Sequence, residues 1–394
     1  MRKAGIYIHI PFCKARCAYC DFLSTTSGTD VQKEYFSALR RDIEGCGERA
    51  GKSGLPGPDS YSVVSVFFGG GTPSLPDPLL LTGILDSVRS CFHLEPDAEI
   101  TVECNPGTLD DRRLSAYLQA GVNRLSIGLQ SADDGMLKKL GRIHDFETYA
   151  REFEAARKTG FSNISVDLMY GLPGQDRASF RETLERVLSL DDPPQHISPY
   201  SLIVEEGTPF WERYHEDAER KSLGDAPLFL PSEDEEAGML SDLKQILIKR
   251  GFHRYEISNW ALPGFESVHN KGYWERREYL GFGLGASGQA GRIRYKKTSS
   301  LPAYLNGDYE GKGRTILTDK DIMEETMFLG LREMCGVTRS HFQESCHAAM
   351  DQVYGDVIRR LAGLGLLSDD GRAIRLTERG IDISTLVLSE FLLA

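Results

Sequence analysis

Residues 5–22, "GIYIHIPFCKARCAYCDF", lead from a strand-like run directly into three of the eight cysteines of the chain. The β-branched and aromatic residues at 5–10 predict a strand, and Cys13, Cys17 and Cys20 follow it as C-x3-C-x2-C. In a parallel α/β fold, sites are built in the loops after the carboxyl ends of strands. Thiolates are soft ligands that suit zinc or an iron–sulfur cluster. This stretch therefore predicts a metal centre after the first strand.

The first half of the chain alternates between strand-like and helix-like segments. Strand-like runs lie at 5–10, 62–68, 98–103, 123–129, 163–170 and 196–202, and amphipathic stretches lie at 31–44, 78–92, 110–119, 146–159 and 176–190. This alternation predicts an α/β fold with a parallel sheet. About six units favour a partial TIM-like barrel; a complete eight-unit barrel is the second alternative, because eight clear strand runs are not found. The segment 45–60, rich in Gly, Pro and Ser, is expected to be a loop.

Three regions are expected along the chain. Residues 1–235 form the barrel core, 236–310 form an extension that carries "HNKGYW" (269–274), and 311–394 form a smaller C-terminal domain. Helical patterns in this last region precede "LLSDDGRAIRLTERG" (366–380), which reads as a β-hairpin. Helices with such a hairpin predict a winged-helix-like α+β domain.

Composition limits the classes of function. The 394 residues have a formal net charge of −12, which argues against broad electrostatic binding of nucleic acid. The sequence contains neither a run of about 18 apolar residues nor a signal-peptide pattern, so a cytoplasmic protein is expected. The other five cysteines are scattered, and we expect them to be reduced and structural.

The number of cysteines helps to separate zinc from an iron–sulfur cluster. A structural zinc ion needs four protein ligands, and only Asp21 or His9 could complete such a set here. Three thiolates on a four-iron cluster would instead leave one iron open to a small molecule. An iron–sulfur cluster is therefore favoured over a zinc ion.

Glycines and polar residues recur where the following strands end. Three of them come from "FFGGGTPS" (67–74), and glycines there let a backbone approach a ligand closely. Each residue alone has a structural explanation, such as a tight turn, a helix cap or a surface ion pair. Their repetition at successive strand ends predicts a ligand site formed by Gly70, Gly71, Thr72, Glu103, Gln130, Arg142 and Asp167.

The cysteine spacing after a first strand resembles the signature of the radical S-adenosylmethionine (SAM) superfamily. The resemblance implies a [4Fe-4S] cluster whose open iron is chelated by SAM, and cleavage of SAM to a 5′-deoxyadenosyl radical. "YIHIPFC", "GGGTP" (69–73) and "GLPGQ" (171–175) narrow it to the family of oxygen-independent coproporphyrinogen III oxidase (HemN) and its relatives. In that family, the positions that match the site of the cluster-bound SAM are Tyr7, Gly70 and Glu103. The positions that match a second SAM site are Tyr19, Gly71, Thr72, Gln130, Arg142 and Asp167, with weaker matches at Ser201 and Ser287.

Two departures separate the chain from the oxidase. The oxidase has a further cysteine two positions after the third, where this chain has Phe22, and it has an extension ahead of a cluster that begins here at residue 13. The "CDF" after the cluster motif and "HNKGYW" instead resemble the heme-chaperone branch, HemW, with its pattern H-N-x-x-Y-W. Decarboxylation of coproporphyrinogen is therefore not expected.

The hexapeptide suggests how heme would bind. His269 would ligate the iron, Tyr273 and Trp274 would pack against the macrocycle, and Lys271 would meet a propionate. The structural alternative is a loop whose aromatic residues fill the edge of the core and whose histidine caps a backbone group. His9 is expected to support the cluster loop. The spare candidates for a second axial ligand are His144, His196 and His253.

The favoured function is a heme chaperone that binds heme, a [4Fe-4S] cluster and SAM. It would deliver heme to an acceptor such as a respiratory membrane protein, with transient membrane association as one expectation. The alternatives are a radical SAM oxidoreductase acting on a porphyrinogen, as the oxygen-independent coproporphyrinogen III oxidase does, and a radical SAM protein of another substrate class. The sequence names no catalytic residue. It leaves open whether SAM is cleaved, how many SAM molecules bind, which acceptor receives heme, how heme is attached and which oligomer forms.

Overall fold

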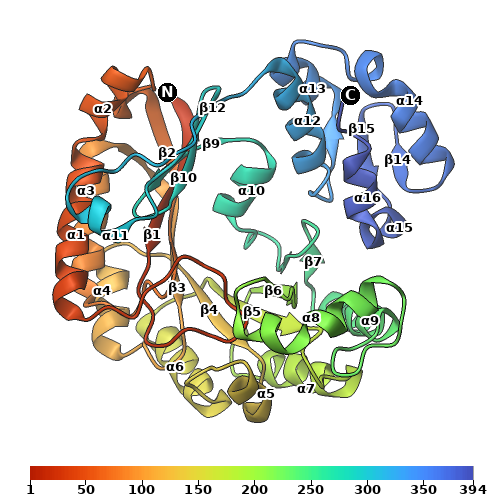
Figure 1. Ribbon diagram of the computed structural model, residues 1–394, viewed down its shortest axis with the longest axis horizontal. Coiled ribbons are helices and arrows are strands. Elements are labelled where there is room, and N and C mark those ends of the chain that lie inside the picture. Colours follow the sequence, from red (N-terminus) through yellow and green to blue (C-terminus); the bar gives the residue numbers. More distant parts are fainter. Residues whose placement is uncertain (394) are drawn as a thin grey trace.

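Six parallel strands form the centre of the computed structural model, which describes residues 1–393 (Figure 1). They pair with one another in chain order, which places all their carboxyl ends along one edge of the sheet. The six are β1 (Arg2–Ile10), β2 (Tyr61–Gly70), β3 (His93–Cys104), β4 (Arg124–Gln130), β5 (Ile164–Tyr170) and β6 (His196–Ser201). The sheet continues to β12 on one side and β7 on the other, and these two edges do not pair with each other. The prediction of a partial, six-unit barrel is confirmed.

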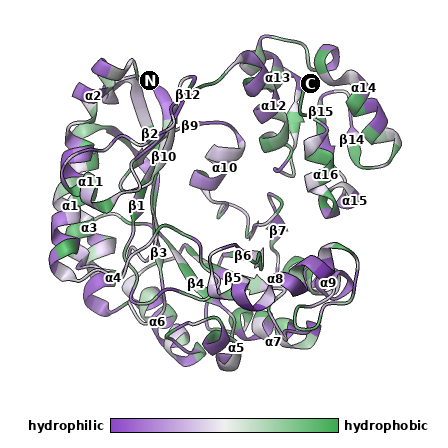
Figure 2. Cartoon of the chain, in the orientation of Figure 1, coloured by the Kyte–Doolittle hydropathy of each residue, from purple (hydrophilic) through white to green (hydrophobic). Residues whose placement is uncertain are grey.

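Helices cover the outer face of these strands and bury their apolar stripes against it (Figure 2). Several helices begin at an aspartate whose carboxylate accepts a hydrogen bond from the first turn, as for Asp77, Asp110, Asp145 and Asp176. The helices of this region are α1 (Thr29–Glu44), α2 (Cys46–Ser53), α3 (Pro78–Cys91), α4 (Asp111–Gln119), α5 (Asp134–Lys139), α6 (Phe146–Thr159), α7 (Arg177–Leu188), α8 (Pro209–Ser222) and α9 (Glu233–Lys249).

The segment 45–60 differs from the expected loop. It contains α2 and a short 3-10 turn, η1 (Pro58–Ser60). Ala50 of α2 is buried, and Gly54 ends the helix in a left-handed conformation with φ of 69°. Packing against the core thus outweighs the weak helix propensity of this glycine-rich sequence.

The extension adds strands to both edges of the sheet. On one side, β9 (Glu278–Phe282) pairs in parallel with β1, and β10 (Ser287–Ala290), β11 (Ile293–Lys296) and β12 (Thr315–Ile316) continue antiparallel. On the other, β8 (Trp260–Ala261) joins β6, and β7 (His253–Arg254) joins β8. Two short helices complete it, α10 (Val268–Trp274) and α11 (Leu301–Leu305). Residues 269–274, "HNKGYW", therefore lie on a helix, α10, between the sheet and the C-terminal part (Figure 1).

The C-terminal part has its own small sheet and its own apolar core. Its strands are β13 (Val337–Thr338), β14 (Leu367–Asp369) and β15 (Ala373–Leu376), paired antiparallel in the order β13-β15-β14. Its helices are α12 (Asp319–Gly330), α13 (Arg339–Cys346), α14 (Met350–Gly363), α15 (Glu378–Asp382) and α16 (Ser384–Ser389). This is the small α+β domain that the sequence predicts, including the hairpin β14–β15. The residue boundaries at 235 and 310 stay predictions. Among residues 1–393, no helix combines the length and the hydropathy that a membrane crossing needs.

Candidate functional site

The loop after β1 carries the three cysteines and is tied down at both ends. The backbone N–H of Cys13 donates to the carbonyl of Thr25 (2.9 Å), and the N–H of Thr25 donates to the carbonyl of Pro11 (2.6 Å). In its middle, the N–H of Ala18 donates to the carbonyl of Leu140 (2.9 Å). His9 also holds the loop, because its Nε2 lies 2.9 Å from the carbonyl oxygen of Leu23. The loop is therefore folded over the carboxyl ends of the strands.

All three cysteines line one cavity, the cysteine cavity, of about 720 Å³ including solvent at its opening. The predicted site residues that line it with Cys13, Cys17 and Cys20 are Tyr19, Gly70, Gly71, Thr72, Glu103, Gln130, Arg142 and Asp167. Tyr7 lines a neighbouring cavity. Ser201 lies at the end of β6 beside Gly171, Ser287 is exposed on β10, and neither lines the cysteine cavity.

Two side chains donate hydrogen bonds to the cysteine sulfurs. Thr72 Oγ1 lies 3.7 Å from Cys13 Sγ, and Arg142 Nη1 lies 3.5 Å from Cys17 Sγ. Asn105 joins these donors, because its Nδ2 donates to Thr72 Oγ1 (2.7 Å) and its Oδ1 accepts from Arg142 Nη2 (2.7 Å). Arg142 Nε is buried without a protein partner.

This donor set fits a thiolate-bound cluster with an anionic group beside it. Within residues 1–393, no three His, Cys, Asp or Glu side chains, Asp21 and His9 included, come together in a group that could hold one metal ion.

The glycines at the end of β2 let the segment that includes His9 and Phe12 pack closely against their backbone. Gly70 has φ of 116°, and a Cβ there would lie 2.5 Å from the ring of His9. A Cβ on Gly71 would lie 2.9 Å from the backbone oxygen of Phe12, at the start of the cluster loop. Gln130 also has a positive φ, 73°, which is uncommon for a residue other than glycine. It follows a bulge in the pairing of β4 with β5 and lines the same cavity. Such irregular backbone often marks a functional site.

Two carboxyl groups give this cavity an acidic side. Burial, together with the charge of Asp167, raises the pKa of Glu103 from 4.5 to about 8, although Glu103 Oε2 accepts a hydrogen bond from the N–H of Gly70 (3.0 Å). Burial likewise raises the pKa of Asp167 to about 6, although Ser126 Oγ donates to it (3.3 Å). A ligand cation would relieve the cost of ionising these acids. With Arg142 on the same walls, the cavity offers opposite charges to a zwitterionic molecule.

A second cavity, the α10 cavity, adjoins the first. It has an empty volume of about 540 Å³ and shares Glu103, Ser126 and Asp167 with the cysteine cavity. The residues that line only this second cavity are Tyr7, Phe67, Arg124, Ser198, Tyr200, His269, Asn270 and Tyr273. Three of them, His269, Asn270 and Tyr273, come from α10, which lies against β2 and β9. The hexapeptide is thus brought to the same edge of the sheet as the cysteines.

His269 is held on every side. Its Nδ1 lies 2.9 Å from Ser65 Oγ, and its Nε2 lies 3.0 Å from Tyr273 Oη. The ring stacks on Phe67 with centroids 5.0 Å apart, and the backbone N–H donates to Glu99 Oε1 (3.0 Å). Burial, with the positive charges of nearby arginines, lowers the pKa of His269 to about 3. The imidazole is therefore neutral near pH 7, the form that binds a metal.

The other expected heme contacts lie elsewhere. Trp274 lies under the guanidinium of Arg332, whose Cζ is 4.4 Å from the ring centroid, so this indole faces the C-terminal part. Neither Trp274 nor Lys271 lines the α10 cavity. The three spare histidines do not line it either. His196 bonds Ser165 and Tyr255, His253 pairs with Glu266, and His144 lines a small pocket beside Arg142.

Sequence reasoning missed several residues of these walls. Arg124 is 2% exposed, its Nε lies 3.9 Å from Glu99 Oε2, and it lines the α10 cavity. Arg124 could have been found as a charged residue at the start of a buried strand. A buried charge needs a functional or structural partner. Asn105 is the first residue after β3, and it could have been found from its place two positions after Glu103 at the end of that strand.

Comparison with known proteins identifies the family of the chain. The model of the radical SAM superfamily matches residues 7–187, and that of the HemN C-terminal domain matches 317–383. The protein named heme chaperone HemW in Lactococcus lactis is 36% identical over 389 residues, covering 98% of this chain and 97% of that protein. The protein of the same name in Bacillus subtilis is 35% identical, covering 98% of each chain.

This chain belongs to the HemW family. As a member of the radical SAM superfamily, it is expected to carry a [4Fe-4S] cluster and SAM. The solved structure of coproporphyrinogen III oxidase (HemN) from Escherichia coli superposes with a TM-score of 0.82, covering 99% of this chain and 90% of that one. At 23% identity, this likeness shows that the HemW-family chain has the HemN fold. The resemblance stated from the sequence is confirmed.

Proposed function

We propose that this HemW-family protein binds heme beside its radical SAM cofactors and transfers the heme to acceptor proteins. The observation that supports this most directly is the position of α10. It brings His269 and Tyr273 to a cavity that shares Glu103 and Asp167 with the cysteine cavity. The curated relatives in Lactococcus lactis and Bacillus subtilis are named as heme chaperones. These names support heme as the ligand of this cavity.

In this proposal the cysteine cavity holds the resident cofactors. Cys13, Cys17 and Cys20 would ligate the cluster, Glu103 would receive the amino group of SAM, and Arg142 would receive a SAM carboxylate. A reduced cluster would supply an electron to SAM. The protein's own part is to hold both groups and to keep the thiolates hydrogen-bonded, through Thr72 and Arg142.

Heme would bind through His269. Its imidazole is neutral, but both ring nitrogens are already hydrogen-bonded, so ligation of iron requires one of these bonds to open. Nε2 is the nitrogen to release, since its partner Tyr273 lines the cavity with it. Losing one such bond costs about 1 kcal/mol. The hydroxyl of Tyr273 therefore opposes ligation weakly, whereas its ring remains available to pack on a macrocycle.

Delivery of heme to a respiratory membrane protein completes the proposal. Contact with the membrane would be transient, through the acceptor, and the protein would act from the cytoplasm. Oxidation of a porphyrinogen is the second candidate, but no observation favours it over the first. Phe22, at the position of the oxidase's further cysteine, has an apolar side chain that is 62% exposed and lines the cysteine cavity.

The test is an anaerobic titration of the cluster-loaded protein with hemin in the presence of SAM. Wild type should bind one heme per chain with a saturable Soret band. His269→Ala should weaken binding at least tenfold, and Tyr273→Phe should bind as tightly as wild type or up to about fivefold more tightly, because one opposing hydrogen bond is gone. The matched control is His253→Ala, since His253 is 44% exposed and lies outside both cavities.

A parallel incubation with coproporphyrinogen III, SAM and a reductant tests the second candidate. We expect no vinyl-bearing product. Conversion to protoporphyrinogen at many turnovers, or heme binding that is identical in wild type and His269→Ala, would contradict the proposal.

A further inference from the structure

A buried carboxylate joins β3 to the helix that carries His269. Glu99 is 7% exposed, and its two oxygens accept three hydrogen bonds from the start of α10. Oε1 accepts from the N–H of His269 (3.0 Å) and from Ser267 Oγ (3.3 Å), and Oε2 accepts from the N–H of Val268 (3.0 Å). Glu99 lines neither the cysteine cavity nor the α10 cavity, so its contacts are with the helix and not with the space that a ligand would fill.

Arg124 supplies the countercharge of this carboxylate. Its Nε lies 3.9 Å from Glu99 Oε2, and both side chains are more than nine-tenths buried. A buried charge is tolerated when it is paired, and removal of one partner leaves the other uncompensated. Glu99 therefore binds the first turn of α10 and balances the charge of Arg124 at the same time.

The ring of His269 fits closely between two strands. A Cβ on Gly5 of β1 would lie 3.2 Å from this ring, Phe67 of β2 stacks on it with centroids 5.0 Å apart, and Ser65 Oγ lies 2.9 Å from its Nδ1. Because the ring is enclosed in this way, Nε2 faces Tyr273 and the α10 cavity only while the first turn of the helix keeps its place.

We propose that Glu99 is a positioning residue for the heme site, which fixes α10 so that Nε2 of His269 can leave Tyr273 and ligate iron while the helix stays in place. The inference rests on the proposed heme function. It gives Glu99 no contact with heme, so its whole effect on heme must pass through His269.

Glu99→Gln keeps the size of the side chain and removes this role. An amide has one acceptor oxygen, whereas the N–H groups of Val268 and His269 each use a different oxygen of Glu99. The new NH2 group would face one of these donors, and Arg124 would lose its countercharge. In the hemin titration of cluster-loaded protein with SAM, we expect heme to bind at least tenfold more weakly. At saturation, the Soret band should match that of His269→Ala, because iron no longer reaches the imidazole.

Glu152→Gln is the matched control. Glu152 is 8% exposed, accepts hydrogen bonds from the N–H groups of Gly107 (3.0 Å) and Leu109 (3.2 Å), and lines neither cavity. The same chemical change is thus made to a buried carboxylate that holds a different segment. Heme affinity and the Soret band of Glu152→Gln should stay those of wild type. A merely structural loss would appear equally in both variants.

A double variant shows whether the effect passes through His269. In the His269→Ala protein, Glu99→Gln should change heme affinity less than twofold, because the group that it positions is already absent. An additive loss would mean that Glu99 acts on heme by another route.

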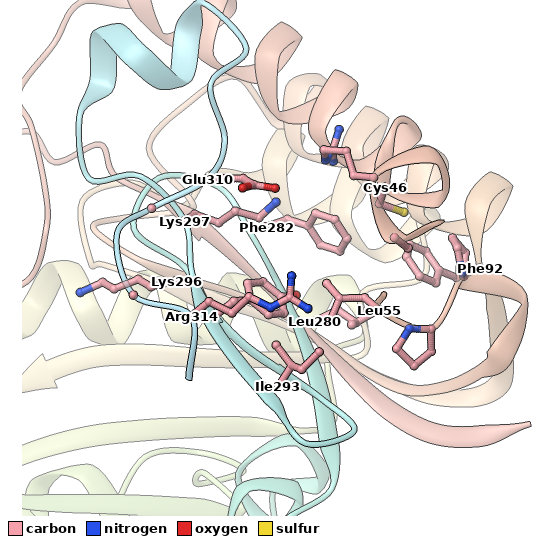
Figure 3. A pocket seen from close by; sticks show the side chains of 17 residues that line it. Cys46, Leu55, Phe92, Leu280, Phe282, Ile293, Lys296, Lys297, Glu310 and Arg314 are labelled. Atoms are coloured by element: carbon pink, nitrogen blue, oxygen red, sulfur yellow. The ribbon is translucent and has the colours of Figure 1, made fainter. Parts of the chain in front are cut away.

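Adsorption of hemin to other apolar surface is tested separately. The chain has an apolar cavity between α2 and β9, and Figure 3 shows Leu55, Leu280 and Phe282 around it. It lies on the other face of the sheet, because Leu280 and Phe282 line it, whereas Tyr279 between them packs against Tyr273 of α10. Leu55→Trp, which fills this cavity, should bind heme as wild type does.

Ser267→Ala is a milder variant that keeps the test valid if Glu99→Gln does not fold. It removes one of the three hydrogen bonds to Glu99 together with the cap of α10, and we expect heme to bind two- to fivefold more weakly. Its control, Ser232→Ala, removes the cap of α9 and should not change heme affinity. Unchanged cluster absorbance and cooperative urea unfolding establish that each variant is folded.

Three results would overturn the proposal. They are heme binding by Glu99→Gln with wild-type affinity and Soret band, an equal loss in Glu152→Gln, and an additive loss in the double variant. Heme affinity that falls in Leu55→Trp and not in Glu99→Gln would overturn it as well. Failure of the heme function is distinguishable, because His269→Ala itself would then bind heme as wild type does, and the role of Glu99 would fall with it.

Discussion

Replacing Glu103 with Gln should stabilise the SAM-free protein as the pH rises and weaken its affinity for SAM. The structure gives the reason for both effects. Glu103 lies at the end of β3, where burial raises the pKa of its carboxyl from 4.5 to about 8. An amide of the same size keeps the hydrogen bond from the N–H of Gly70 without any ionisation.

The sign and size follow from proton linkage. Below pH 4.5 the carboxyl is protonated in both the folded and the unfolded chain, so it causes no pH dependence there. Between 4.5 and about 8 the unfolded chain loses this proton and the folded chain keeps it, so the free energy of unfolding falls as pH rises. The full loss is at most about 5 kcal/mol, because one pKa unit corresponds to about 1.4 kcal/mol. Glu103→Gln removes this loss.

The assay is urea unfolding of SAM-free, cluster-loaded protein at pH 5, 6.5 and 8. The difference in unfolding free energy between Glu103→Gln and wild type should grow by several kcal/mol across this series. The control Glu216→Gln, at an exposed position, should follow wild type. SAM should bind Glu103→Gln about tenfold more weakly, because a charge-assisted hydrogen bond to its amino group is lost. If the stability of wild type and Glu103→Gln changes with pH in parallel, the raised pKa of Glu103 is wrong.

Three further substitutions test the cofactor site and the buried ion pairs that support the fold. Cys17→Ser should abolish the visible absorption of the iron–sulfur cluster. The control Cys335→Ser, at an exposed cysteine outside the cavities, should keep this absorption. Full iron content in Cys17→Ser would show that the ligand assignment is wrong. Gly71→Ala should weaken SAM binding at least tenfold by calorimetry, since its Cβ would press on the cluster loop, and Gly57→Ala, with open space around it, should not differ from wild type. Asp42→Asn should cost about 3–5 kcal/mol in urea unfolding, because it leaves two basic side chains without their buried carboxylate, and a loss below 1 kcal/mol would contradict that role.

Much of the fold and the cofactor site follows from local sequence rules. The six parallel strands lie where β-branched runs predict them, and aspartates cap several of the helices between them. Because parallel strands place their carboxyl ends at one edge, Glu103, Gln130 and Asp167 could be expected to meet the cysteine loop, and they line the same cavity.

The remaining features depend on contacts between distant segments. The hexapeptide alone does not show that α10 turns His269 and Tyr273 toward the cavity and Trp274 toward Arg332. Which face is buried there depends on packing against β2, β9 and the C-terminal part. In the same way, α2 forms at a segment expected to be a loop, and it lines one cavity together with β9, a strand more than two hundred residues later. Such long-range packing is not encoded in a local pattern.

Transfer of heme to an acceptor is the decisive test of the proposed chaperone function. Heme-loaded protein is mixed anaerobically with membranes from heme-depleted cells, and the recovery of quinol oxidase activity is followed against the same concentration of free hemin. A heme chaperone should restore activity faster than free hemin does, and His269→Ala should lose this advantage. Recovery no faster than with free hemin, from protein shown to carry one heme per chain, would contradict it.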